Sequence, residues 1–423
     1  MLRTLLALLL LAAPLAAQQR VTLPQRDRDL AGTPATVLTV GREEGESWEL
    51  LSNVSGVDFD AADNLYILDA GNHRVVVVDA RGRLVRTIGR RGGGPGELLA
   101  PSALAVLADG TIAVADLGRA ALSIFERDGS FRYNLPFVDS LGQPGPEQRN
   151  STPTLQPHAN GLAVFGSVRI AMGGPQGAGP IAPPADVPVY VRPLAERAPA
   201  RVLYRIPRDP PLLRTSGGEN DRTVRNVPRL LVPQPAWAVL PDGAVAAVHG
   251  TSPDYRVYLV DATGRTTRVL QRAIPPRRVS REDRERAREQ LAERMRSGAG
   301  MMRVEVRAEG GNVQRSVTTG GGRGPDEAVI REQLRDAQFG DVVPVVTGLR
   351  ADARGRLWIA RAPRRVGDPG PIDLVTADGR YLGTLPPQPL PDALSRSGLA
   401  AYIALDEFGV EQVVVKRLPP AWR

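Results

Sequence analysis

The sequence predicts an all-β protein, a six-bladed β-propeller with four-stranded blades, from three observations. Short β-branched runs such as Leu65–Asp69 and Val75–Asp79 are bounded by Asn, Gly and Asp, as in strands joined by tight turns. Paired turns recur with similar internal spacing, whereas the distance between pairs varies: Asn64 to Gly82, Gly110 to Gly129, Gly243 to Gly264 and Gly355 to Gly379. A lone four-stranded sheet cannot bury both faces, so the units must stack, and radial stacking gives a propeller.

The chain begins with the features of a secretory signal peptide. Arg3 precedes the apolar run Leu5–Leu15, and the small residues Ala16 and Ala17 follow. The run is shorter than the roughly 20 apolar residues that span a bilayer. We therefore expect residues 1–17 to be a cleaved signal peptide, with an uncleaved anchor as the alternative. The mature protein is then periplasmic or secreted, without a transmembrane segment, and residues 18–34 form an N-terminal lead segment.

The amino-acid composition excludes several kinds of functional site and partner. The chain has no cysteine, which excludes disulfides, thiolate metal sites, a cysteine nucleophile and the lipidated cysteine of a lipoprotein. Its net charge of +8 comes almost wholly from arginine, interspersed with 46 acidic residues. Aromatic residues, on which single-stranded nucleic acids stack, make up only 4%. We therefore predict no nucleic-acid partner.

Five blades can be followed through their turns, and the propeller is predicted to span residues 35–423. A sixth blade needs three strands from the C-terminal sequence DALSRSGLAAYIALDEFGVEQVVVKRL and a fourth from the N-terminal run Ala35–Val40. The N-terminal strand would then close the ring and cover an exposed strand edge.

The first blade carries a family resemblance. The sequence DAGNHRVVVVDARGRLVRTIG, followed by the glycine-rich G-x-G-P-G-E-L and a proline, resembles the NHL-type repeat of exported bacterial six-bladed β-propellers. This fold hosts both binding modules and enzymes. Six-bladed lactonases hold a divalent ion in the channel with Asp, Asn and Glu, but no residues here match that set. No cofactor is predicted. The sequence does not decide whether a divalent cation binds in the channel.

The glycine-rich run GRRGGGPGEL could instead grip phosphate. A phosphate loop must open a helix, whereas the strand sequence ALAVLADGTIAV follows here. We therefore interpret the run as a connector between blades one and two.

Strand parity predicts which end of the ring binds a partner. In an antiparallel blade the first and third turns lie at one end, and the second turn and the connector to the next blade lie at the other. The insertions of this chain are predicted at the second end: Asn134–Gln156, Arg169–Pro188, Pro207–Pro235, Pro275–Val342 and Arg361–Pro371. We call it the elaborated end and the other the trimmed end. Because loops on a rigid scaffold carry function, we expect a protein or envelope macromolecule to bind there.

A helical insertion, residues 275–341, precedes blade five. Ser280 and Asp283 form a capping-box pattern, and the helix they open continues through Met295. A second helix is predicted over Asp326–Phe339. The pair could lie across the mouth of the ring or pack on one blade, and the sequence does not choose between these arrangements.

Candidate site residues follow from the same parity. His73 and His249 belong to the elaborated end and could form a two-histidine metal site or be solvated, whereas His158 belongs to the trimmed end. Asp69, Asn72 and Arg74 form either a polar ring around the mouth or a structural clamp in the turn. GxSxG, HExxH and Walker motifs are all missing from the sequence.

Arginines are also concentrated at the elaborated end and could attract an acidic partner: Arg74, Arg90, Arg91, Arg119, Arg361, Arg364 and Arg365. The alternative is that they pair with Asp69, Asp116 and Glu97 and leave no net field. We expect a non-catalytic binding protein. The runner-up is a metal-dependent propeller enzyme of the lyase or lactonase type with its site in the central channel.

Overall fold

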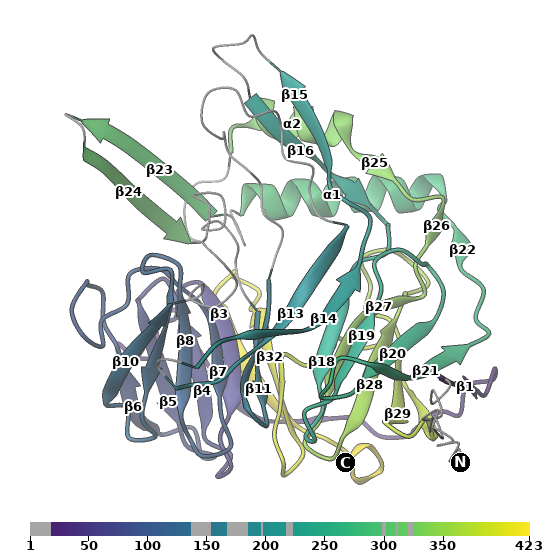
Figure 1. Ribbon diagram of the computed structural model, residues 1–423, viewed down its shortest axis with the longest axis horizontal. Coiled ribbons are helices and arrows are strands. Elements are labelled where there is room, and N and C mark those ends of the chain that lie inside the picture. The colour runs from purple at the N-terminus through teal and green to yellow at the C-terminus, as the bar shows by residue number, and fades with distance from the viewer. Residues whose placement is uncertain are drawn as a thin grey trace, which may run out of the picture.

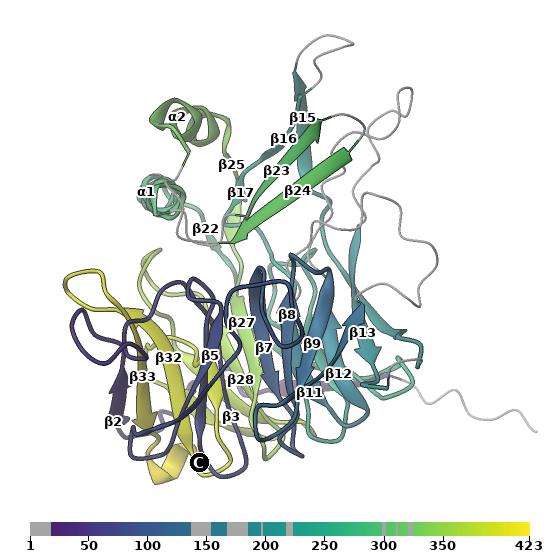
Figure 2. The same cartoon turned by 90° about the vertical axis from the view of Figure 1, so that its left-hand side faces the viewer.

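Six blades form a closed ring around a central channel, and Figures 1 and 2 show this ring from the side. The computed structural model describes residues 18–136, 154–166, 185–195, 198–216, 223–297, 302–309, 312–319 and 325–423. The predicted signal peptide, residues 1–17, lies outside them. The six-bladed, four-stranded propeller predicted from the sequence is confirmed.

The first three blades contain strands in simple sequential order. In blade one the strands are β3 (Val54–Phe59), β4 (Leu65–Asp69), β5 (Arg74–Val78) and β6 (Leu84–Ile88). In blade two they are β7 (Pro101–Val106), β8 (Ile112–Asp116), β9 (Ala121–Phe125) and β10 (Phe131–Pro136). In blade three they are β11 (Thr154–His158), β12 (Gly161–Phe165), β13 (Asp186–Arg192) and β14 (Arg201–Pro207).

Blades four and five repeat this order. In blade four the strands are β18 (Ala236–Val239), β19 (Val245–Val248), β20 (Arg256–Val260) and β21 (Thr266–Arg272). In blade five they are β27 (Val346–Ala351), β28 (Arg356–Arg361), β29 (Ile372–Thr376) and β30 (Tyr381–Leu385).

Blade six joins the two ends of the chain, as predicted. Its order is β2-β33-β32-β31, from strands β31 (Ala393–Leu394), β32 (Leu399–Leu405), β33 (Glu411–Arg417) and β2 (Ala35–Val40). β2 pairs antiparallel to β33, with Val40 opposite Val413. Val40 is buried in the cluster that blade six shares with blade one. The N-terminal strand therefore supplies the outer strand of the last blade.

The lead segment reaches further around the ring than the sequence indicated. β1 (Gln19–Leu23) pairs parallel to β21 and adds a fifth strand to blade four. The chain then crosses blade five, where the Leu30 amide donates to the Thr384 carbonyl at 2.8 Å. Residues 18–34 thus form a strap from blade four to blade six, which we call the N-terminal strap.

In blades one and five an aspartate side chain closes the first turn. Asp60 Oδ1 accepts the amides of Ala62 and Asn64, both at 2.9 Å, which closes the turn. Asp352 holds the same position in blade five, where the Trp358 indole donates to its Oδ2 at 3.2 Å. Gly110 lies at φ 90°, a left-handed conformation that favours glycine. These side-chain bonds replace the ladder bonds that the chain loses when it reverses.

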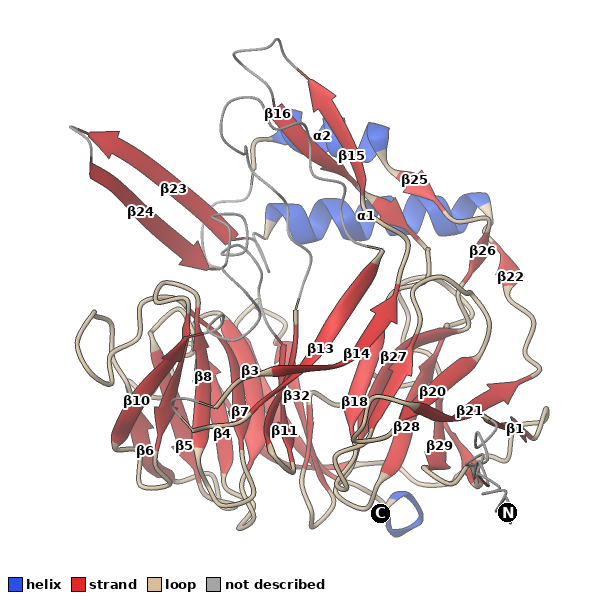
Figure 3. Cartoon of the chain, viewed as in Figure 1, coloured by secondary structure: helices blue, strands red, loops and turns tan. Residues whose placement is uncertain are grey.

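The described insertions lie on one side of the ring (Figures 2 and 3); most of the insertions Asn134–Gln156 and Arg169–Pro188 lies outside the described residues. We call these elements the capping layer: hairpin β15 (Leu212–Ser216) with β16 (Thr223–Val227), β17 (Arg229–Leu230), β22 (Arg277–Arg278), α1 (Arg281–Arg296), hairpin β23 (Met302–Glu309) with β24 (Asn312–Thr319), α2 (Glu327–Asp336), β25 (Gln338–Phe339) and β26 (Val342–Val343).

The capping box of α1 is present as predicted: the Ser280 hydroxyl accepts the Asp283 amide and the Asp283 carboxylate accepts the Ser280 amide. The second helix is shorter than the predicted Asp326–Phe339. It ends at Asp336 because residues 338–339 pair in parallel with β17. Sequence reasoning missed the hairpin β23–β24 between the helices. In the described part of the chain, no helix is long and apolar enough to cross a membrane.

Candidate functional site

Asp69, Asn72 and Arg74 form a clamp at the second turn of blade one. Asp69 is fully buried at the end of β4 and accepts from the Ser52 amide at 2.9 Å and from Arg74 Nε at 2.7 Å. Asn72 Nδ2 donates to Asp69 and to the Leu50 carbonyl. The hydrogen-bonding groups of these side chains are used within the turn and in the chain that enters the blade, as the structural alternative predicts.

Blade two repeats the clamp and uses it to hold the glycine-rich connector. Asp116 is fully buried and accepts the Leu99 and Ala100 amides, at 2.8 and 2.9 Å. Arg119 donates to the Gly94 carbonyl at 2.7 Å. Inside the connector the Glu97 carboxylate accepts the Gly94 amide at 2.6 Å, where a bound anion would otherwise sit. The run Arg90–Leu98 is therefore a braced inter-blade connector, as the strand sequence after it predicts.

His249 ends the second strand of blade four, where blade one has Asp69. Its ring stacks on Tyr258 with centroids 3.6 Å apart, and its Nε2 lies 2.9 Å from the Tyr204 hydroxyl. Burial lowers the pKa of His249 to about 4, so the ring is neutral at physiological pH. His249 therefore contacts Tyr258 on β20 of its own blade and Tyr204 on β14 of blade three.

The three histidines lie apart. His73 occupies the second turn of blade one with φ 58°, and burial and the charge of Arg91 lower its pKa. Blade one faces blade four across the ring, so His73 and His249 cannot share a metal ion. His158 is buried at the trimmed end, where its Nε2 lies 2.9 Å from the Gly243 carbonyl and links blades three and four.

Arg361 does not face a partner. It is buried at the end of β28 and its Nη2 contacts Asp27 of the N-terminal strap at 2.7 Å. Asp27 also pairs with Arg272 at 2.6 Å, and Arg272 pairs with Asp373 at 2.7 Å. Arg272 and Asp373 are 0% exposed. We call these four residues the strap network. Burial alone would raise the pKa of Asp27, but hydrogen bonds from Arg361 and Arg272 lower it.

The remaining arginines of the elaborated end divide into two groups. Arg90 pairs with Glu97 at 2.9 Å and Arg365 pairs with Glu282 of α1 at 3.2 Å. Arg91 and Arg364 are exposed and form no ion pair within the described residues. Five of the seven arginines singled out in the sequence therefore have a carboxylate partner: Arg74, Arg90, Arg119, Arg361 and Arg365.

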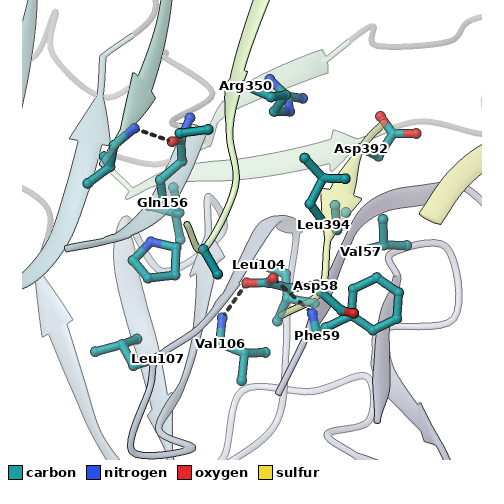
Figure 4. A pocket seen from close by; sticks show the side chains of 18 of the residues that line it. Val57, Asp58, Phe59, Leu104, Val106, Leu107, Gln156, Arg350, Asp392 and Leu394 are labelled. Atoms are coloured by element: carbon teal, nitrogen blue, oxygen red, sulfur yellow. Dashed lines mark hydrogen bonds between the residues drawn. The ribbon is translucent and has the colours of Figure 1, made fainter. Parts of the chain in front are cut away.

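The central channel holds polar groups that sequence reasoning missed. A cavity of about 380 Å³ reaches the trimmed end and is lined by the first strands of the blades (Figure 4). Asp58, Arg350 and Asp392 line it from blades one, five and six. One signal was available in the sequence, because Asp58 and Arg350 each stand two residues before a first-turn aspartate, on the innermost strand. Within the described residues no group of three or more His, Cys, Asp or Glu could hold a metal ion.

Burial raises the pKa of Asp58 from 3.8 to about 6, although the Val106 and Phe59 amides donate to its carboxylate. Asp58 is partly buried between the blades, so its charged form is less well solvated than in water.

Asp58 should therefore make stability pH-dependent. The unfolded chain ionises this group near 3.8 and the folded chain near 6, so its contribution to stability falls as the pH rises through that window. In Asp58→Asn, which cannot ionise, we expect the decline in unfolding free energy between pH 4 and pH 7 to shrink by up to about 3 kcal/mol. Urea unfolding at several pH values measures it. Asp109→Asn, in an exposed turn, is the control, and parallel profiles for wild type and Asp58→Asn would contradict the assignment.

Comparisons with known proteins agree with the fold. Residues 45–139, which contain blade one and the strands of blade two, match the model of the family DUF5128, described as a 6-bladed beta-propeller. No curated protein matches the sequence. The predicted resemblance to NHL-type six-bladed propellers is thereby confirmed at the level of the fold.

Solved structures similar to this chain are distant. A gluconolactonase from Xanthomonas campestris is 14% identical with a TM-score of 0.35, over 92% of this chain and 98% of that one. A DUF4221 family member from Bacteroides vulgatus is 9% identical with a TM-score of 0.44, over 91% and 98%. A virginiamycin B lyase from Staphylococcus aureus is 10% identical with a TM-score of 0.35, over 87% and 96%. At these values no activity carries over.

Proposed function

We propose that this six-bladed β-propeller is an exported, non-catalytic protein that binds a protein or envelope macromolecule through its elaborated end. One observation carries the proposal. The described insertions form the capping layer at that end, while the first turns at the trimmed end are short. A rigid ring that supports such a layer is the usual arrangement for binding loops.

Polar contacts join the elements of the capping layer to one another. Arg214 of β15 pairs with Asp336 of α2 at 2.6 Å, and Arg296 of α1 pairs with Glu327 of α2 at 2.6 Å. The buried residues of the two helices are few and mostly small: Asp283, Ala287, Ala292 and Ile330. Exposed ion pairs of this kind contribute little stability. A layer that adds so little apolar core is better explained by recognition than by stabilisation of the ring.

The charge of the expected partner follows from the arginines that remain free. Arg91 and Arg364 stand at the elaborated end without an internal carboxylate, and other exposed arginines of the capping layer also form no ion pair within the described residues: Arg278, Arg294, Arg331 and Arg335. An acidic partner would complement them. Its attraction would fall with salt, since the screening length is about 8 Å at physiological ionic strength.

The test uses two double variants in the same two blades. Arg91→Glu/Arg364→Glu reverses the free arginines of blades one and five at the elaborated end. Arg81→Glu/Arg354→Glu reverses exposed arginines of the same blades at the trimmed end and is the control. Each mature protein is immobilised, and partners are captured from the source's envelope fraction at several salt concentrations.

We expect wild type and control to capture the same partner, with capture falling as salt rises. The elaborated-end variant should retain it about tenfold less well. Equal capture by the two variants would show that the wrong end or the wrong force was chosen. Failure to capture any partner after crosslinking would instead favour a purely structural role.

A further inference from the structure

The channel cavity contains a cationic side chain that the ring itself does not neutralise. Corresponding positions of the innermost strands lie two residues before the first turn of each blade. In blades one, three and five these positions are Asp58, Gln156 and Arg350, and in blades two, four and six they are Ala105, Ala238 and Ala393. Polar side chains therefore alternate with alanine around the channel.

Two of the three polar side chains serve the fold. Asp58 Oδ2 accepts the Val106 amide of blade two at 2.8 Å, and Gln156 Oε1 accepts the Val239 amide of blade four at 2.8 Å. Each one satisfies an amide on the free edge of the next blade's innermost strand. These two hydrogen bonds explain why blades one and three carry a side chain with an acceptor oxygen at this position.

Arg350 cannot play that role, because a guanidinium has donors only. Its one hydrogen bond runs from Nη1 to the Leu349 carbonyl at 3.2 Å, and it forms no ion pair within the described residues. It lines the cavity and is only partly accessible. Burial lowers the pKa of Arg350, because its charged form is poorly solvated between the blades. The remaining donors of Arg350 are available to a ligand.

Asp392 of blade six supplies the complementary charge without touching Arg350. Figure 4 shows the two side chains toward the same side of the cavity. The Ile403 amide donates to Asp392 Oδ2 at 2.8 Å, and the other carboxylate oxygen has no bond within the described residues. Asp392 is exposed to the cavity, and the surrounding blades raise its pKa by partial desolvation. A cation and an anion are thus held near each other but unpaired.

The wall formed by blades two to four is mostly apolar. It is lined by Leu104, Leu107, Pro157, Val239 and Leu240. The charged side chains of the lining therefore lie on blades five, six and one, whereas blades two to four add apolar side chains and the uncharged Thr154 and Gln156. At about 380 Å³ it lies within the range of small-molecule sites, roughly 300–1,000 Å³.

We propose that the channel binds a small zwitterion, a free amino acid with an apolar side chain. Its carboxylate contacts Arg350, its ammonium contacts Asp392, and its side chain lies against the leucines and prolines of the opposite wall. Arg–carboxylate contacts can be bidentate and short, which suits a planar guanidinium in a confined space. The site lies in the channel, distinct from the capping layer, so it does not depend on the proposed function.

Isothermal titration calorimetry of the full mature chain tests the site with three matched probes. Leucine carries both charged groups, 4-methylpentanoate lacks the ammonium, and 3-methylbutylamine lacks the carboxylate. We expect leucine to bind the wild type about tenfold more tightly than either analogue, because only leucine contacts both side chains.

The variants assign each contact. Arg350→Gln should weaken leucine and 4-methylpentanoate about tenfold and leave 3-methylbutylamine unchanged. Asp392→Asn, which keeps the bond from the Ile403 amide, should weaken leucine and the amine but leave the acid unchanged. Arg354→Gln, exposed at the same end, is the control. Melting temperatures equal to wild type establish that the variants fold.

Two results would overturn the proposal: leucine binding that is no tighter than that of its analogues, or leucine binding that Arg350→Gln leaves intact. If the melting temperature of Arg350→Gln falls, the proposal is tested by titrating Asp392→Asn with the three probes. Leucine and amine binding that this variant leaves intact would then overturn it. Capture of a macromolecular partner by the channel variants is expected to match wild type, so the two proposals fail separately.

Discussion

A chain that begins at Gly41, and so lacks β2, should lose about 5 kcal/mol or more of unfolding free energy, or fail to fold, whereas one that begins at Pro34 should fold. β2 forms a ladder with β33 and buries Val40 beside Val413. Each lost backbone hydrogen bond costs about 1 kcal/mol and each large apolar side chain about 1.5–3 kcal/mol. Because a domain has only about 5–15 kcal/mol in total, this loss threatens the whole ring.

The chain that begins at Pro34 is the matched control, since it loses the N-terminal strap but keeps the closing strand. Thermal and urea unfolding of the two truncations against residues 18–423 separates ring closure from the strap. The truncation at Gly41 should also associate through the uncovered edge of β33, which sedimentation would detect. Equal melting temperatures for the two truncations would mean that β2 does not hold the ring closed.

Removing the carboxylate of Asp373 should destabilise the protein by about 3–5 kcal/mol, because a buried charge is left without its partner. In Asp373→Ala the fully buried Arg272 keeps Asp27, whose side chain is 41% exposed, as its one carboxylate partner within the described residues. The Thr384 hydroxyl also loses its acceptor, at 2.6 Å in the intact chain. Urea unfolding of the mature chain at neutral pH measures the loss.

Asp209→Ala provides the comparison for Asp373→Ala, since Asp209 forms an exposed pair with Arg229 at 3.1 Å. Exposed pairs contribute about 0–1 kcal/mol, so this variant should unfold almost as wild type does. The loss of unfolding free energy in Asp27→Ala should lie between those of the other two variants, because water can replace part of the hydrogen bonding that Asp27 provides to Arg361. A loss of under 1 kcal/mol in Asp373→Ala would show that the strap network is not a buried electrostatic unit.

Turn chemistry and strand periodicity are local properties, and they were enough to predict the fold. Aspartate and glycine at the turns predicted the blade units, because each reversal needs a side-chain acceptor and a left-handed backbone within a few residues. The Ser280–Asp283 capping box placed the start of α1 for the same reason. Antiparallel parity assigned the insertions to one end, and the described ones lie there, a consequence of connectivity alone.

Pairing between distant residues could not be predicted in this way. Arg361 was assigned to an exposed surface, but it meets Asp27 from 334 residues away once the N-terminal strap crosses blade five. The lead segment gave no signal that it would supply this carboxylate. The role of Arg361 was decided by which strand edge the strap covers.

The sequence by itself determined the blade units of this protein, with their turns, their number, the closing strand and the elaborated end, because each depends on neighbouring residues or on the order of the chain. Only the tertiary structure decided which charges are neutralised and which remain free. The strap network neutralises Arg361, and the channel brings Arg350 and Asp392 together from separate blades. The physical reason is that charge compensation and desolvation depend on distances across the ring, and those distances exist only after the blades have closed.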